Sequence, residues 1–355
     1  MKKNYFMLAA ATMMFAACAE TDLVNEVNME EAPKAIGFDA FANKTTRAAI
    51  EEADDLKEDG VGFHVWGYKT VSGAEQTVFS GDNVYWAAAE GTTSAHWAYN
   101  NTRYWDKEAT SYNFYAVAPQ LDNVENRYII SAAKKITIND VASGPANTAT
   151  DYLIDRDGVT VDGEEVSIGD EIQFNFSHIM SKVTVQVKHN TTPGTNVDVV
   201  LTDLAMSGWN INNGTFTQDK YVTVIDPQTQ EEQKDSQGNP VMVKQEWQLA
   251  TTTAETTSGD YTFLTSGNTT LDKTNATTIG SYLMVPQTGV YLTFTISYKI
   301  GEETFLTHEG TIENQTWATN THYTYTITVG PADIKFNVSE VNGWTIDTGN
   351  GTTIQ

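Results

Sequence analysis

The chain has 355 residues, and its 21 Lys and Arg against 46 Asp and Glu give a formal net charge of −25. A surface this acidic repels polyanions, so we exclude a nucleic-acid partner. A single cysteine excludes intrachain disulfides, and the length allows two domains of roughly 150 residues each.

The first eighteen residues have the order of a secretory signal. A positively charged start precedes an apolar run at residues 5–15, and small residues close this run just before Cys18. We therefore expect residues 1–17 to be a lipoprotein signal peptide and Cys18 to be acylated, for example with palmitate. Acyl chains contribute about 0.8 kcal/mol per buried CH₂, so the lipid would anchor the chain. The alternative is ordinary secretion with cleavage after Ala19.

The next segment is predicted to be removable. Residues 18–34 are acidic and form a tether, and a first strand is predicted at 35–41 with Ile36, Phe38 and Ala40 on one face. Arg47 follows in a run of small residues, with Ala48 after it. An exposed arginine of this kind favours cleavage after Arg47 by an arginine-specific protease.

Beyond Ala48 the hydrophobic period is two almost everywhere. β-branched and aromatic residues alternate with polar ones at 183–188, 292–300 and 323–329, which predicts half-buried antiparallel strands. The pattern favours two β-sandwiches, at residues 35–170 and 171–330. A hairpin is predicted between residues 221–225 and 241–247.

Residues that carry chemistry are scattered. The six histidines form no metal-ligand spacing, and His178 is interpreted as a structural hydrogen-bonding residue. The run that starts at Asp155 predicts a turn in preference to a calcium loop, because position 153 is Leu. We expect no catalytic residue, no metal and no cofactor. Trp86, Trp97 and Trp105 fall in one aromatic-rich region, where core packing is favoured over a glycan-stacking platform.

The C-terminal residues 331–355 repeat the pattern of the first strand. Ile334, Phe336 and Val338 have the spacing of Ile36, Phe38 and Ala40, and Gly330-Pro331 separates them from the preceding strand. We expect this segment to lie outside the last sandwich strand as an appendage. Once cleavage frees the N-terminal strand, the C-terminal strand of another copy would add to the open sheet, where main-chain hydrogen bonds supply affinity.

Several landmarks in order resemble the fimbrillin family, the subunits of type V pili of Bacteroides-group bacteria. After the lipoprotein signal and the Ile36 strand, the landmarks are Arg103-Tyr104-Trp105, Tyr112 to Pro119, Asp151-Tyr152-Leu153, Phe174 to His178, Val285-Pro286-Gln287 and Val341 to Trp344. The resemblance implies an all-β fold of two tandem transthyretin-like Greek-key β-sandwiches. It also implies export to the outer membrane and cell surface, arginine-specific processing and polymerisation by strand exchange.

The function predicted from these observations is that of a structural pilin, not an enzyme, used for adhesion and colonisation. Its predicted partners are other copies of itself and related pilin subunits, an arginine-specific protease, and the outer membrane through the lipid anchor; no receptor is predicted. The alternatives are a surface glycan-binding lipoprotein and a tip or anchor accessory pilin. A secreted hydrolase is disfavoured because no catalytic constellation is present.

Overall fold

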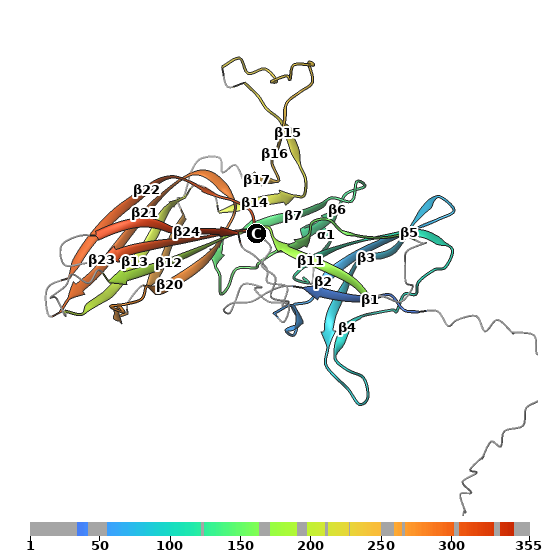
Figure 1. Ribbon diagram of the computed structural model, residues 1–355, viewed down its shortest axis with the longest axis horizontal. Helices are drawn as coiled ribbons and strands as arrows, with labels where there is room; N and C mark the ends of the chain where they lie inside the picture. The colour runs from blue at the N-terminus through green and yellow to red at the C-terminus, as the bar shows by residue number, and fades with distance from the viewer. Residues whose placement is uncertain are drawn as a thin grey trace, which may run out of the picture. The chain divides into compact units, whose positions relative to one another are not determined.

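The computed structural model describes residues 34–41, 55–121, 124–162, 171–189, 197–209, 212–226, 228–249, 259–264, 267–301, 305–329 and 334–343. These residues form an all-β fold (Figure 1), which confirms the predicted fold class. The helical elements among them are η1 (Asp55–Lys57) and α1 (Val124–Arg127). Within this described part of the chain, neither helix is long and apolar enough to cross a membrane.

The largest sheet collects strands from the N-terminal half. Its order is β1 (Gly37–Phe41), β11 (Glu171–His178), β9 (Leu153–Asp155), β5 (Ala109–Ala118), β2 (Phe63–Val71), β3 (Ala74–Ala87) and β4 (His96–Tyr99), and β10 (Val159–Asp162) also pairs with β5. Alternation on β11 turns Ile172, Phe174 and Phe176 inward. They join residues from β1, β2, β3 and β5 in a buried cluster that we call the N-terminal core.

Two five-stranded sheets enclose a C-terminal core. One has the order β24 (Ile334–Gly343), β23 (Thr321–Val329), β12 (Ser181–His189), β20 (Thr277–Met284) and β8 (Gly144–Pro145). The other has the order β18 (Gly259–Leu264), β13 (Val199–Trp209), β21 (Gln287–Ile300) and β22 (Leu306–Trp317), with β19 (Thr269–Thr270) paired to β13. The alternating runs predicted at 183–188, 292–300 and 323–329 are confirmed as the strands β12, β21 and β23, and their apolar residues pack in this core. The predicted antiparallel pairing is wrong for one pair, because β12 and β23 run parallel, and a period of two is the same in both kinds of pair.

A four-stranded sheet joins the two halves of the chain. Its order is β17 (Trp247–Leu249), β14 (Asn213–Thr217), β7 (Ile136–Ala142) and β6 (Tyr128–Ile130). The sheet packs over a third buried cluster that includes Ile138, Phe216, Trp247 and Leu283. β8 adds a second link, because it pairs with β20 of the C-terminal half.

The boundary between the halves lies later than predicted. We placed it after residue 170, but β11 pairs with β1 and β9, so its residues belong to the N-terminal sheet. The physical reason is that the three large apolar side chains of β11 complete the N-terminal core. Apart from the short strand β8, the chain enters the C-terminal sheets at β12, after Ile179 and Met180.

A hairpin projects from the edge of the four-stranded sheet (Figure 1). Strands β15 (Tyr221–Thr223) and β16 (Met242–Lys244) pair in antiparallel register, which confirms the hairpin predicted from the sequence. Tyr221 and Met242 are exposed on it.

Candidate functional site

The N-terminal strand completes the large sheet with two kinds of pairing. The N–H of Ile36 donates to the carbonyl of Arg103 at 2.9 Å, and the N–H of Trp105 donates to the carbonyl of Lys34 at 3.0 Å. From Gly37 onward the strand changes neighbour and runs parallel to β11, with Gly37 opposite Glu171. Residues 34–41 are therefore held by backbone bonds along their described length.

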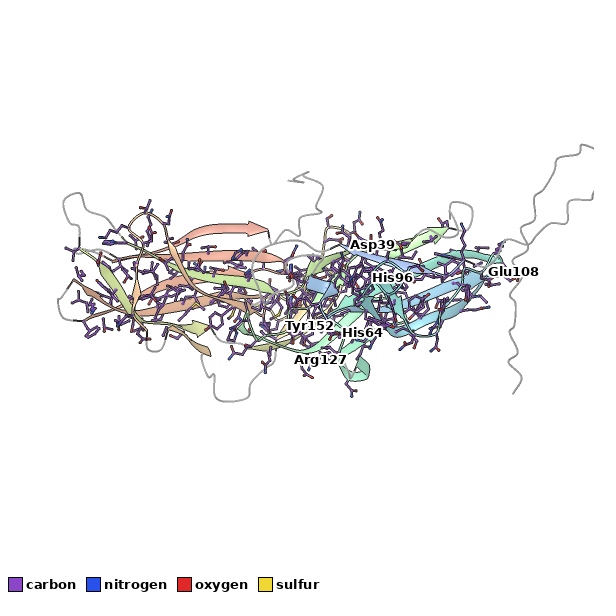
Figure 2. The ribbon with its side chains drawn as sticks, turned by 90° about the horizontal axis from the view of Figure 1, so that it is seen from below. Asp39, His64, His96, Glu108, Arg127 and Tyr152 are labelled. Carbon is purple, nitrogen blue, oxygen red and sulfur yellow. The ribbon has the colours of Figure 1, made fainter. Side chains whose placement is uncertain are left out.

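Two side chains of this segment enter the N-terminal core. Ile36 is 1% exposed and Phe38 is 2% exposed. The Phe38 ring stacks on Phe174 at 5.8 Å between centroids, with an interplanar angle of 21°. Four further rings meet its edges or face at 5.2–6.3 Å, namely those of Phe63, Phe79, Tyr99 and Phe114. We call this set of five rings the aromatic groove; Figure 2 draws the side chains here and labels Asp39 on β1.

A tyrosine and an arginine fix one wall of the aromatic groove. The Tyr99 hydroxyl donates to the carbonyl of Ile36 at 2.7 Å, and burial raises the pKa of this phenol. Arg103 places its guanidinium 5.1 Å from the ring centre of Phe79 and pairs with Asp82 at 2.7 Å. This wall is thus tied to both the backbone of the N-terminal strand and the neighbouring strand β3.

The structure accounts for part of the predicted site. Ile36 and Phe38 face the core, and Ala40 lies on β1 with its backbone opposite Phe174. Their displacement stays a prediction. Cys18, Arg47 and Ala48 lie outside the described residues.

The predicted donor strand is paired within its own chain. We expected Ile334, Phe336 and Val338 to lie outside the last sandwich strand. The structure instead places β24 antiparallel to β23, with Phe336 opposite Ile327. The reason is that β23 would otherwise expose a row of backbone N–H and C=O groups, which an adjacent strand can satisfy. β24 is thus the edge strand of this sheet and not a free appendage.

The tryptophan region does not form an open platform. Trp97 and Trp105 are buried in the N-terminal core, at 7% and 5% exposed. Trp86 is half-buried and meets Trp97 edge-on at 5.2 Å, while the ammonium of Lys57 lies 4.6 Å from its ring centre. These side chains serve core packing, so the glycan-stacking interpretation of this region loses its support.

Two other motifs have structural roles. His178 and Asp151 are each 1% exposed at the side chain and lie 3.0 Å apart, which makes His178 a buried hydrogen-bonding residue as predicted. The carboxylate of Asp155 accepts backbone N–H bonds from Asp157, Gly158 and Asn175. This arrangement confirms the predicted turn. Within the described ranges, no three His, Cys, Asp or Glu gather closely enough to hold a metal ion.

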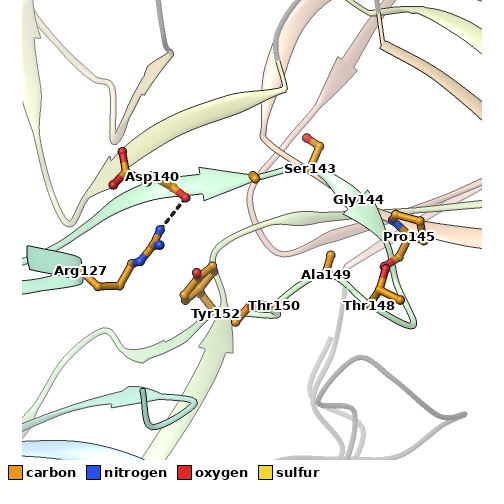
Figure 3. Close-up of a pocket in the computed structure, with 10 residues that line it drawn as sticks. Arg127, Asp140, Ser143, Gly144, Pro145, Thr148, Ala149, Thr150 and Tyr152 are labelled. Carbon is orange, nitrogen blue, oxygen red and sulfur yellow. Dashed lines mark hydrogen bonds between the residues drawn. The ribbon is translucent and has the colours of Figure 1, made fainter. Parts of the chain in front are cut away.

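A small cavity of about 410 Å³ lies beside β7 and β8 (Figure 3). Arg127 lines it but donates to the carbonyls of Asn139 and Asp140 at 2.7 and 2.6 Å. Its guanidinium therefore fixes the backbone at Asp140, which adopts a φ of 50°. Among the described residues, no buried polar atom without a partner lines this cavity. Sequence reasoning had no signal for it, and it carries no assignment.

Fold and groove together define an all-β protein whose first strand completes the core of the sheet that follows. The chain matches the fimbrillin-like family over residues 46–344 and belongs to that family, which confirms the resemblance seen in the sequence. It is similar in fold to a solved fimbrial protein from Bacteroides vulgatus ATCC 8482, with 18% identity and a TM-score of 0.59 over 88% of this chain and 100% of the other. A fimbrial assembly protein from Parabacteroides distasonis ATCC 8503 aligns with 12% identity and a TM-score of 0.34, over 89% and 99%. The curated proteins contain no match.

Proposed function

We propose that this chain is a structural pilin of a cell-surface type V fimbria that serves adhesion and colonisation. It is exported as a lipoprotein, cleaved after Arg47 and polymerised by donor-strand exchange. The observation that carries the proposal is Phe38, which fills the aromatic groove from a strand that lies upstream of the arginine. Membership of the fimbrillin-like family supports the same function.

Cleavage after Arg47 removes the covalent link between β1 and the rest of the subunit but leaves the contacts of β1 in place. In the intact chain β1 is tethered to its own groove, where it competes at an effective concentration on the order of millimolar. After cleavage the strand belongs to a separate peptide, which the aromatic groove and the backbone hydrogen bonds hold on the subunit. A strand from another subunit then competes with it on equal terms. Refilling the sites of Ile36 and Phe38 contributes about 1.5–3 kcal/mol for each side chain.

The incoming strand in this proposal is β24 of another copy. Its sequence repeats Ile36 and Phe38 of the N-terminal strand at the same spacing, so one register fills both sites. In this proposal β24 leaves β23, its partner in the same chain, before it enters the sheet of another copy. The exchange therefore trades one set of backbone hydrogen bonds for another and gains the aromatic groove.

The test is a charge placed in the groove through the donor strand. We expect Phe336→Asp to abolish polymer ladders on a non-boiled gel, because an unpaired carboxylate would enter an apolar site. Asn337→Asp is the matched control, since it adds the same charge at the position that Asp39 occupies on β1. Circular dichroism checks that both variants are folded. If Phe336→Asp polymerises like the parent chain, β24 is not the donor, and the role of a tip or anchor accessory pilin replaces that of a structural pilin.

The earlier steps have their own readouts. Surface material should begin at Ala48 on N-terminal sequencing, and a start at Ala19 or Glu20 would contradict both lipidation and processing. Cys18→Ala should lose labelling by a clickable palmitate analogue, because the thiol is the proposed acylation site. Labelling that persists in this variant would exclude the lipoprotein anchor.

A further inference from the structure

On the outward face of β1, a glycine lies next to an acidic residue. Gly37 lies directly opposite Glu171 in the parallel β1–β11 register. A Cβ atom placed on Gly37 would lie 3.1 Å from Cγ of Glu171 and 3.9 Å from Oε1. Glu171 is exposed, so its side chain has room to adjust to a larger neighbour. Within the folded chain, Gly37 has no side chain that could pair with the Glu171 carboxylate.

The donor strand would present a cation at the same place. Aligning Ile334 and Phe336 with Ile36 and Phe38 puts Lys335 where Gly37 now lies. The same alignment puts Asn337 where Asp39 lies. Residues 36–40 carry one Asp and no base, a charge of −1, whereas residues 334–338 carry one Lys and no acid, a charge of +1. Exchange therefore raises the charge of the inserted strand by two in a chain whose formal net charge is −25.

We propose that Glu171 forms an ion pair with Lys335 of a second copy of this chain and so selects the donor strand over the resident N-terminal strand. The proposal rests on the proposed function, because the pair exists only between subunits. Within its own chain, Lys335 lies on β24 opposite Thr328, in a different sheet from Glu171. Complementary charge across an interface acts mainly on register and association rate, so Glu171 is a specificity residue.

The experiment is a charge swap in the full-length chain, with polymer growth followed on non-boiled gels after arginine-specific cleavage. Glu171→Lys and Lys335→Glu should each slow polymer growth by about two- to fivefold at low ionic strength, the range of an exposed ion pair. The chain that carries both changes should recover the parent rate. The acid introduced at position 335 of one copy then faces the base introduced at position 171 of the next, so the ion pair forms again with its charges reversed. Added salt should shrink the differences.

Glu309→Lys is the control for net charge, since it makes the same change on exposed β22, away from the aromatic groove. It should leave the rate unchanged. Equal rates for the parent chain and both single swaps, or a double variant as slow as the singles, would overturn the ion pair. Failure of the proposed function has a separate signature, namely no polymer from the parent chain or normal polymer from Phe336→Asp.

Discussion

Truncation of Phe38 tests whether the first strand is a structural part of the unprocessed subunit. Phe38→Ala removes a ring that is 2% exposed and meets five other rings. Buried Phe→Ala changes cost about 3–5 kcal/mol. We expect the upper part of this range, because aromatic pairs add about 0.5–1.5 kcal/mol beyond area burial. Urea unfolding of the uncleaved chain, followed by tryptophan fluorescence, measures the loss of unfolding free energy.

The matched control is Phe305→Ala, which removes the same atoms from a side chain that is 62% exposed. It should change the unfolding free energy by less than about 0.5 kcal/mol. The stability of the assembled polymer is a second test. Under the proposed mechanism, the strand that carries residue 38 has been displaced from each subunit of the polymer. Polymers from Phe38→Ala and the parent chain should then be equally stable. A loss below about 1 kcal/mol in the uncleaved chain would refute the reasoning that Phe38 fills the core.

Two buried bases give pH-dependent predictions. His64, labelled in Figure 2, accepts the N–H of Leu121 at Nε2 and donates from Nδ1 to the carbonyl of Gly81, and burial lowers its pKa below 6.5. Below pH 6.5 the unfolded state therefore binds more protons than the folded state, so the unfolding free energy should fall as the pH decreases. His64→Gln should flatten this fall, and urea titrations from pH 7 to 5 measure it. Burial lowers the pKa of Lys182 to about 8 from 10.5. Its contribution to the unfolding free energy should therefore rise between pH 8 and 10.5, by up to about 3 kcal/mol, and the difference curve against Lys182→Met should show that rise; a flat difference curve would contradict it.

The positions of the strands with strict alternation could be predicted because alternation is a local property. The inward faces of β12, β21 and β23 follow from every second residue being β-branched or aromatic. The same reasoning predicted that Ile36 and Phe38 share one face, and both are buried.

Strand partners could not be predicted in the same way. A period of two is the same in parallel and antiparallel pairs, so nothing in residues 37–41 indicated the parallel pairing with β11. The three apolar residues of β11 suit either core, which is why the boundary was placed too early. The pairing of β24 with β23 was missed for a related reason. Its sequence matches β1, but a match in side chains does not specify which backbone edge is open.

The sheet that β14 and β7 share would resist pulling force in a fibre. Under the proposed assembly, pulling force enters a subunit at the aromatic groove and leaves it through β24. The covalent link at Ile179 and Met180 does not carry this load alone, because β7 is hydrogen-bonded to β14 and β8 to β20. Separating the halves must break these ladders and expose the buried cluster around Phe216. Tension on such a subunit is therefore opposed by these ladders as well as by the covalent chain.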